Sequence, residues 1–459
     1  MIKCPNCSAE LEFDSKSQSV TCEYCRSTFN PKELDVSIKT SEEKVLSGTY
    51  EGKSYLCSQC GAELMNFDET AITFCSYCGS QAMIESKMIK RNNPEFIIPF
   101  KLTKEDCIKA YKRKVSKSLF APNYLKSDIV VSKFRGIYIP YCIYKLSFKG
   151  DSINKGSKYS HRSGDYVYYD DYNIHALVDA EYDGISYELI SKFYDEYSHA
   201  IPHNFKEAEP FNVNYLAGFY ADASDVDDYI YSDNAKKIVD DNSINYMVKR
   251  REFRKYGCSN PKVSFSVTDR RVGMFPLYFL ALRDKENKNV NYAIVNGQTG
   301  KVAADLPVDF KKYILTSLLL AIPIFFLINS QLVVVPKMIC IFSIVVSFIS
   351  LIISFNQLDN IAIKEQHLND EGYMNVNKNN KIGKPNNIKF KDVYKQLLSI
   401  VLAGLVLFIN FVDDIYYYGA TTIVLLLIIW SFYDLIKEHN LVVSTKLPQL
   451  EKRGGTKDE

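Results

Sequence analysis

The chain lacks the short motifs by which common catalytic sites are recognised. It has no G-x-x-x-x-G-K-[ST] phosphate loop, no G-x-S-x-G turn and no H-E-x-x-H pair. Its six histidines are scattered, and Pro202 between His199 and His203 argues against a helix that presents both on one face. We therefore assign no catalytic residues and do not expect an enzyme of a known type. The region 90–310 is nevertheless large enough for a catalytic site that carries no motif.

An excess of charge of either sign is also missing. The 56 basic and 54 acidic side chains leave a net charge of +2, which gives no overall bias towards nucleic acid or membrane. The acidic segments DYVYYDDY (165–172) and DASDVDD (222–228) lack the D-x-[DN]-x-[DN]-G spacing of a calcium loop. We interpret these acids as loop and helix-start residues and not as calcium ligands.

Cysteine, in contrast, is patterned. Eight of the twelve cysteines form two copies of one motif displaced by 53 residues, and in each copy fourteen residues separate two C-x-x-C pairs. Two such pairs brought together by a hairpin complete a closed tetrahedral Cys4 site for zinc. The sequence predicts two structural Zn²⁺ ions, and metal binding would supply folding energy that such small units lack. The predicted ligands are Cys4, Cys7, Cys22 and Cys25 in a ribbon over 1–40, and Cys57, Cys60, Cys75 and Cys78 in a ribbon over 51–86.

Two other uses of these cysteines are less favoured. Disulfides need an oxidising compartment, and no signal peptide precedes Cys4. A redox C-x-x-C normally occurs once, at the start of a helix, and not as four pairs. The remaining cysteines, Cys107, Cys142, Cys258 and Cys340, are solitary. Cys340 lies in an expected membrane span, and the other three are expected to be small buried side chains and not nucleophiles.

Apolar residues concentrate after residue 312. Four stretches approach or exceed the roughly 20 residues that a spanning helix needs: 313–329, 332–355, 397–412 and 415–433. We expect four transmembrane helices in two hairpins, 313–355 and 395–436, with a loop over 356–394 and a tail over 437–459. Lysine and arginine are absent from the two tight turns but frequent in the loop, in the tail and just before the first span. This bias predicts a multi-pass protein of the cytoplasmic membrane with both termini in the cytosol.

Charged residues are rare within these spans. Lys337 and Asp434 are each near a helix end, from which they can reach the interface, and serines such as Ser347 are expected to serve helix packing. Transport pathways usually display ionisable groups inside the bilayer. An anchor is therefore favoured over a transporter.

Between the ribbons and the spans, the sequence pattern of residues 90–310 predicts a mixed α+β domain. Thr103 and Asp106 resemble a capping box, and apolar residues at helical spacing predict an amphipathic helix over 104–119. The segment 134–148 is typical of a strand, with an edge, bulge or break expected at Pro140. A second helical stretch is expected over 224–254, and 292–304 predicts a hairpin with positive-φ turn positions at Gly297 and Gly300. The segments 136–146 and 273–282 echo each other faintly.

The chain resembles a widespread group of uncharacterised bacterial membrane proteins that carry zinc ribbons similar to the transcription-factor-IIB type. The resemblance rests on the C-x-x-C pairs, IIPFKLTKEDCIKAYKRK, LFAPNYL, GIYIPYCIYKL, YLAGFYADASDVD and YAIVNGQTGKVAADLPV, which cover most of residues 1–310. It implies this order of domains and a membrane location, and it brings no established activity. This chain has two ribbons and so differs from relatives that have one.

The charge on the ribbons bears on the choice of partner. Residues 1–40 carry a net charge of −1 and residues 51–85 a net charge of −4, which disfavours contact with a phosphate backbone. Two basic clusters, one within 86–126 and one at Lys249, Arg250, Arg251, Arg254 and Lys255, are interpreted as solvated faces, with contact to anionic lipid or to nucleic acid as the alternatives.

Together the patterns predict a multidomain protein: two small β zinc ribbons, a cytosolic α+β domain and an all-α four-helix transmembrane region. The expected function is that of a membrane-anchored adaptor or sensor that engages a protein partner at the cytosolic face. A membrane-tethered nucleic-acid-binding protein and an enzyme with an unrecognised site are the alternatives.

Overall fold

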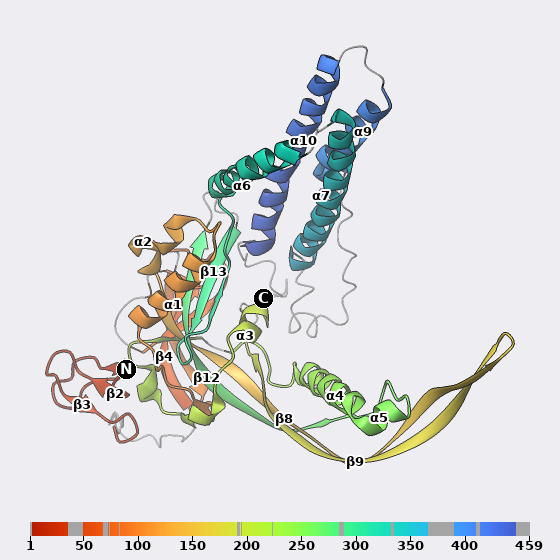
Figure 1. Cartoon of the computed structure of the whole chain (residues 1–459). Helices are drawn as coiled ribbons and strands as arrows, with labels where there is room; N and C mark the ends of the chain where they lie inside the picture. Colours follow the sequence, from red (N-terminus) through yellow and green to blue (C-terminus); the bar gives the residue numbers. More distant parts are fainter. Residues whose placement is uncertain are drawn as a thin grey trace, which may run out of the picture.

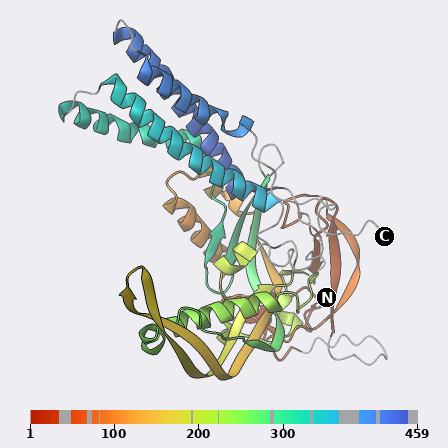
Figure 2. The ribbon, with the colours of Figure 1, turned by 90° about the vertical axis from the view of Figure 1, so that its right-hand side faces the viewer.

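The computed structural model of the chain describes residues 2–34, 49–67, 72, 74–81, 83–190, 193, 195–222, 224–283, 289–331, 335–365, 390–409 and 414–446. Figure 1 shows a β-rich head, a long two-stranded arm that leaves the head, and a group of C-terminal helices that leave it in another direction. Figure 2 shows the same separation of arm and helices from a second side.

The head contains two sheets. The N-terminal sheet has three short antiparallel strands: β1 (Glu12–Asp14), β2 (Ser19–Thr21) and β3 (Thr28–Phe29). The second sheet has twelve strands: β4 (Thr49–Cys57), β5 (Glu63–Asn66), β6 (Met83–Asn92), β7 (Phe96–Ile97), β8 (Arg135–Ser163), β9 (Tyr166–Glu188), β10 (Glu209–Pro210), β11 (Tyr220–Asp222), β12 (Ser266–Arg283), β13 (Asn289–Asn296), β14 (Val302–Ala304) and β15 (Thr445–Lys446). The mixed sheet thus includes segments from 51–86, from 90–310 and from the C-terminal tail.

The order of the main path is β10-β7-β12-β8-β11-β5-β4-β6, and β9 pairs with β8. The strands of 51–86 therefore join the rest of the sheet through β5 and β11. The two segments with the faint echo, 136–146 and 273–282, lie in β8 and β12 and pair with each other antiparallel.

Pro140 lies inside β8 and neither ends nor interrupts it. Its carbonyl accepts a hydrogen bond from the amide of Leu189 at 2.9 Å. The nitrogen and carbonyl of a strand residue point to the same side, so the missing N–H of Pro140 faces that side too. On this side β9 pairs no further than Tyr141, and β11 pairs with Ile137 and Tyr138. The proline therefore occupies the gap between two neighbouring strands.

The helices of the head are short: α1 (Lys104–Lys117), α2 (Asp128–Val131), α3 (Asp195–Ala200), α4 (Ser232–Lys249) and α5 (Arg251–Lys255). The prediction for α1 is confirmed, since the Thr103 side chain accepts a hydrogen bond from the Asp106 amide. The stretch expected over 224–254 starts later, at Ser232, and is divided at Arg250. The hairpin β13–β14 is confirmed, with Gly300 at a φ of 71°. The positive φ expected at Gly297 is wrong; glycine is needed there because a Cβ would lie 2.4 Å from the Phe100 ring.

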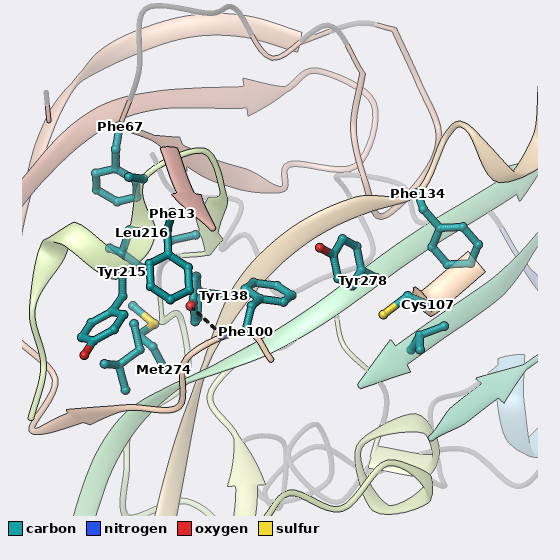
Figure 3. Packing of buried hydrophobic residues seen from close by; sticks show 14 of the residues in the cluster. Phe13, Phe67, Phe100, Cys107, Phe134, Tyr138, Tyr215, Leu216, Met274 and Tyr278 are labelled. Carbon is teal, nitrogen blue, oxygen red and sulfur yellow. Dashed lines mark hydrogen bonds between the residues drawn. The ribbon is translucent and has the colours of Figure 1, made fainter. Parts of the chain in front are cut away.

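An aromatic core joins the N-terminal sheet to the head. Phe100, Tyr138 and Tyr278 pack with Phe13 and Tyr215 in one buried cluster, part of which Figure 3 shows. The Phe100 amide donates to the Tyr138 hydroxyl at 3.3 Å. Burial of such rings is worth about 25 cal/mol for each Å² removed from water, so this cluster fixes both sheets in one body.

The C-terminal helices are α6 (Phe310–Gln331), α7 (Pro336–Glu365), α9 (Phe390–Phe408) and α10 (Asp414–Val443). Among the described residues, two stretches are long and apolar enough to cross a membrane: Pro336–Lys364 and Ile415–Val443. α9 supplies only the shorter apolar stretch Val393–Phe408. Length and composition thus support two of the four expected spans.

The helix group contains polar contacts that sequence alone did not show. Lys395 on α9 pairs with Asp434 on α10, Nζ to Oδ2, at 2.6 Å, and their side chains are only 10% and 24% exposed. Ser347 and Ser399 share a hydrogen bond at 2.7 Å, and Ser354 donates to Glu438 at 2.7 Å. Asp434 is therefore paired within the helix group, a contact that its expected place near the interface did not predict.

Candidate metal centres

The four C-x-x-C pairs form the same backbone turn. The amide of the first cysteine donates to the carbonyl five residues on, and the amide four residues on donates to the carbonyl of that cysteine, at 2.7–2.9 Å in all four turns. The residue four positions after the cysteine has a φ of 58–66° in each case: Ser8, Arg26, Gly61 and Gly79. The tight turn points two sulfurs to the same side of the chain.

Cluster 1, formed by Cys4, Cys7, Cys22 and Cys25, brings two turns together through β1 and β2. Cys4 Sγ is 3.6 Å from Cys25 Sγ, and Cys7 Sγ is 3.4 Å from Cys22 Sγ. All four sulfurs lie within 4.8 Å of one another. Four thiolates at about 2.3 Å from a tetrahedral zinc are about 3.8 Å apart, so the geometry fits this ion.

Cluster 2, formed by Cys57, Cys60, Cys75 and Cys78, has the same arrangement. Cys57 and Cys78, and likewise Cys60 and Cys75, have their sulfurs 3.6 Å apart, and all four lie within 4.8 Å. The structure therefore brings together all eight predicted ligands in the two predicted groups. Both groups suit a structural zinc.

The two clusters differ in burial. All four cysteines of cluster 2 are buried, whereas Cys25 of cluster 1 is exposed and Cys7 is half-buried. A hydrogen bond with Ser27 lowers the pKa of Cys25 to about 6. In cluster 2, hydrogen bonds with Cys60, Cys75 and Cys78 lower the pKa of Cys57. One thiol in each cluster thus has a lowered pKa, whereas the hydrogen bond with Cys57 raises the pKa of Cys60 and of Cys75; zinc binding would require all four thiols of a cluster to lose their protons.

Cluster 2 is attached to the end of β12. Arg283 donates through Nε to the Cys78 carbonyl at 2.6 Å and lies 3.6 Å from the Cys78 sulfur. Tyr77, between two ligands, packs on Phe279 and donates to the Asp222 carboxylate. A Cβ at Gly79 would lie 3.3 Å from the Ala281 carbonyl oxygen. Cluster 2 is thus continuous with the core of the large sheet.

With four cysteine ligands, neither cluster leaves a coordination position for water or substrate, so both suit a structural role and not catalysis.

Other candidate residues are not assembled into a site. Cys107, Cys142, Cys258 and Cys340 are buried and separate, and burial raises the pKa of Cys107 and of Cys142 to about 12. Residues 166–172 form the exposed start of β9, Asp165 lies in the turn before it, and Asp222 accepts a hydrogen bond from Tyr77.

Sequence reasoning missed the arm. β8 and β9 run for 29 and 23 residues, and from Phe148 to Ser163 β8 pairs with β9 alone. The loop after α5 supports the arm as far as residue 157: the Lys262 amide donates to Asn154 at 2.6 Å, and the Ser157 amide donates to Gly257 at 3.5 Å. The arm tip, residues 158–170, extends beyond this support (Figure 1).

These features define a protein with two tetracysteine centres that fit zinc ribbons, a mixed sheet and long apolar helices. In sequence the chain is similar to the uncharacterised protein YdjG of Bacillus subtilis (strain 168), with 27% identity over 319 residues, covering 67% of this chain and 90% of the relative. No protein-family model matches the chain, and no solved structure matches it. The clusters fit zinc ribbons, while the transcription-factor-IIB type stays a prediction.

Proposed function

We propose that the chain is a membrane-anchored zinc-ribbon protein that acts as an adaptor or sensor, engaging a protein partner at the cytosolic face. The observation that carries this proposal is the arm tip. Tyr159, Tyr166, Tyr168 and Tyr169 are 48–74% exposed there. Tyrosine is enriched at protein interfaces, because it combines a large apolar surface with a hydroxyl group.

The need for a partner follows from the physics of a two-stranded ribbon. A hairpin that packs on nothing is at best marginally stable in water. Both edges of the arm tip have free backbone groups, which suit addition of a strand from another protein. The closed cysteine clusters support the same role, since they fix the shape of the head from which the arm extends.

Membrane anchorage is the second part of the proposal, with α6, α7, α9 and α10 as the four spanning helices. At 22 residues α6 is about 33 Å long, which matches the hydrocarbon core. Three helix ends lie at the head. The Val308 amide before α6 donates to Asn440 near the end of α10 at 2.7 Å, and Lys364 at the end of α7 donates to the Val442 carbonyl at 3.1 Å. An even number of crossings, with head and tail on the cytosolic side, is consistent with these contacts.

The adaptor role is tested by cross-linking and pull-down from membranes. The tip variant carries Tyr159→Ser, Tyr166→Ser, Tyr168→Ser and Tyr169→Ser. Its matched control carries Tyr24→Ser, Tyr124→Ser, Tyr229→Ser and Tyr246→Ser, which remove four tyrosines that are 56–83% exposed elsewhere. We expect one protein to be captured by the wild type and by the control and to be lost from the tip variant. Equal capture by all three chains would contradict the proposal.

A second candidate function is binding of a small molecule in a cavity of about 710 Å³, in keeping with the alternative of an unrecognised site. Glu95, Asp183, His203 and Arg271 line it, and within the described part of the chain His203 Nε2 is buried without a hydrogen-bond partner. Burial lowers the pKa of His203 to about 3, so its ring is neutral. Thermal-shift measurements against amino acids and nucleotides test this candidate, and His203→Phe should abolish any shift.

A further inference from the structure

A basic pocket of about 340 Å³ lies between α1 and the turn that joins β13 to β14. Arg113, Lys114 and Lys117 line it from the helix, and Lys301 lines it from the turn. The remaining lining residues are Ala110, Ala200, Gly300 and Val302, so no carboxylate borders the pocket. All four cationic side chains are exposed.

The cations of this pocket differ from their neighbours on α1. Lys109 pairs with Asp106 at 3.6 Å, and Lys112 pairs with Asp128 at 2.9 Å. Throughout the part of the chain that the structure describes, no ion pair involves Arg113, Lys114, Lys117 or Lys301. The helix thus directs its paired lysines to other faces and its unpaired cations to the pocket.

Attraction to the C-terminal end of α1 accounts for only part of this arrangement. Lys114 and Lys117 lie in the last turn, where the helix dipole favours positive charge. Lys301, however, belongs to another element and brings a like charge towards them. Four like charges around one pocket repel each other, and a bound anion would remove that repulsion.

The source of the anion follows from what the same helix contacts. The chain leaving α1 packs on the start of α6: Asp309 donates through its amide to the Phe120 carbonyl at 2.8 Å, and Lys312 Nζ donates to Asn123 at 2.8 Å. The Phe120 and Tyr313 rings lie 5.4 Å apart. Lys117, at the C-terminal end of α1, is therefore three residues from the segment that packs on the start of α6, whereas Lys301 lies at the end of β13 opposite to its pairing with β15.

We propose that the basic pocket binds the phosphate group of an anionic lipid at the membrane surface. The inference rests on the proposed membrane anchorage, and it assigns this part of the 86–126 basic cluster a ligand. The second basic cluster, at α4 and α5, lies along the arm and apart from the C-terminal helices (Figure 1). It supplies two residues of the control variant, Lys249 and Arg251.

The test uses the full-length protein in detergent, mixed with short-chain phosphatidylglycerol and phosphatidylcholine, and native mass spectrometry to count retained lipid. The pocket variant carries Arg113→Gln, Lys114→Gln, Lys117→Gln and Lys301→Gln. The control carries Arg251→Gln, Lys237→Gln, Lys249→Gln and Lys262→Gln, so that the same four charges are removed elsewhere. Each basic residue near an anionic surface contributes about a fivefold factor in binding. We expect the pocket variant to lose at least about tenfold in phosphatidylglycerol retention and the control to match the wild type.

Several results would overturn the inference. An equal loss in the two variants would show general electrostatics and no site. Displacement of the lipid by millimolar inorganic phosphate would identify free phosphate as the ligand, and tighter binding of an RNA oligonucleotide would reassign the pocket to nucleic acid. Carbonate extraction of the wild type from membranes would show instead that the anchorage fails. Two zinc ions in each variant would confirm that the substitutions leave the head folded.

Discussion

At the scale of single residues, the four metal-site turns demand one unusual backbone conformation and meet it in two ways. Gly61 and Gly79 supply it in cluster 2, whereas Ser8 and Arg26 adopt it in cluster 1. A side chain in the left-handed region costs about 1–2 kcal/mol. Cluster 1 therefore has backbone strain at two positions, whereas glycine at the equivalent positions of cluster 2 avoids this strain.

Gly79→Ala is expected to weaken cluster 2, because alanine disfavours a φ of 66° and its Cβ would lie 3.3 Å from the Ala281 carbonyl oxygen. We predict a loss of about 1–2 kcal/mol in the free energy of unfolding and faster zinc release to a chelator. Gly404→Ala is the matched control, since nothing lies within 4 Å of a Cβ there. Unchanged release from Gly79→Ala would refute the prediction.

Asp305 predicts a pH dependence. It accepts hydrogen bonds from the Tyr197 hydroxyl at 2.8 Å and the Tyr292 amide at 2.7 Å, and burial raises its pKa from 3.8 to about 7. Between these values the folded protein binds more protons than the unfolded chain, so stability falls as the pH rises through this window. Asp305→Asn cannot ionise. From pH 5 to 7, its free energy of unfolding should therefore rise relative to that of the wild type by up to about 1.4 kcal/mol per pH unit, as measured by thermal unfolding. A difference that does not vary with pH would contradict this account.

At the scale of elements, the two clusters are expected to fail differently. All four cysteines of cluster 2 are buried in one core with β8 and β12, whereas cluster 1 belongs to the three-stranded sheet, contributes only Cys4 and Cys22 as buried residues to its shared core with the head and leaves Cys25 exposed. Cys75→Ser should therefore raise amide exchange across β4, β5 and β12, while Cys25→Ser should raise it mainly within residues 2–34. Hydrogen-exchange mass spectrometry checks both variants. The same exchange pattern in the two would show that cluster 2 has no special link to the large sheet.

The contact between α9 and α10 supports a second prediction at this scale. Lys395→Met or Asp434→Leu alone leaves a buried charge unpaired, which costs about 3–5 kcal/mol. The double variant removes both charges and should recover most of that loss, as measured by thermal unfolding in detergent. Additive losses in the double variant would mean that the ion pair at 2.6 Å contributes little to stability.

Elements with a local signal were the ones that sequence could predict. Cysteine spacing is sufficient for both clusters, Thr103 marks the start of α1, and Gly300 marks the β13–β14 turn. The arm was missed because its tip is exposed on both faces, so no apolar alternation marks it. The pairing of Lys395 with Asp434 was missed because it depends on helices packing across a long separation in sequence.

At the scale of the whole molecule, segments at the end of the helix group contact the head. β15, which follows α10, pairs with β13, and Asn440 exchanges two hydrogen bonds with Val308. The helix group is thus attached to the head at its beginning and its end. A change of shape in the helices would reach the sheet through these contacts.

The central claim is that thiolate-bound zinc shapes the head. Zinc K-edge X-ray absorption on the purified full-length protein, with elemental analysis of the same sample, tests it most directly. We expect two zinc ions per chain, each surrounded by four sulfurs at about 2.3 Å. Fewer than two ions, with the cysteine sulfurs oxidised or nitrogen and oxygen atoms in place of sulfur, would contradict it.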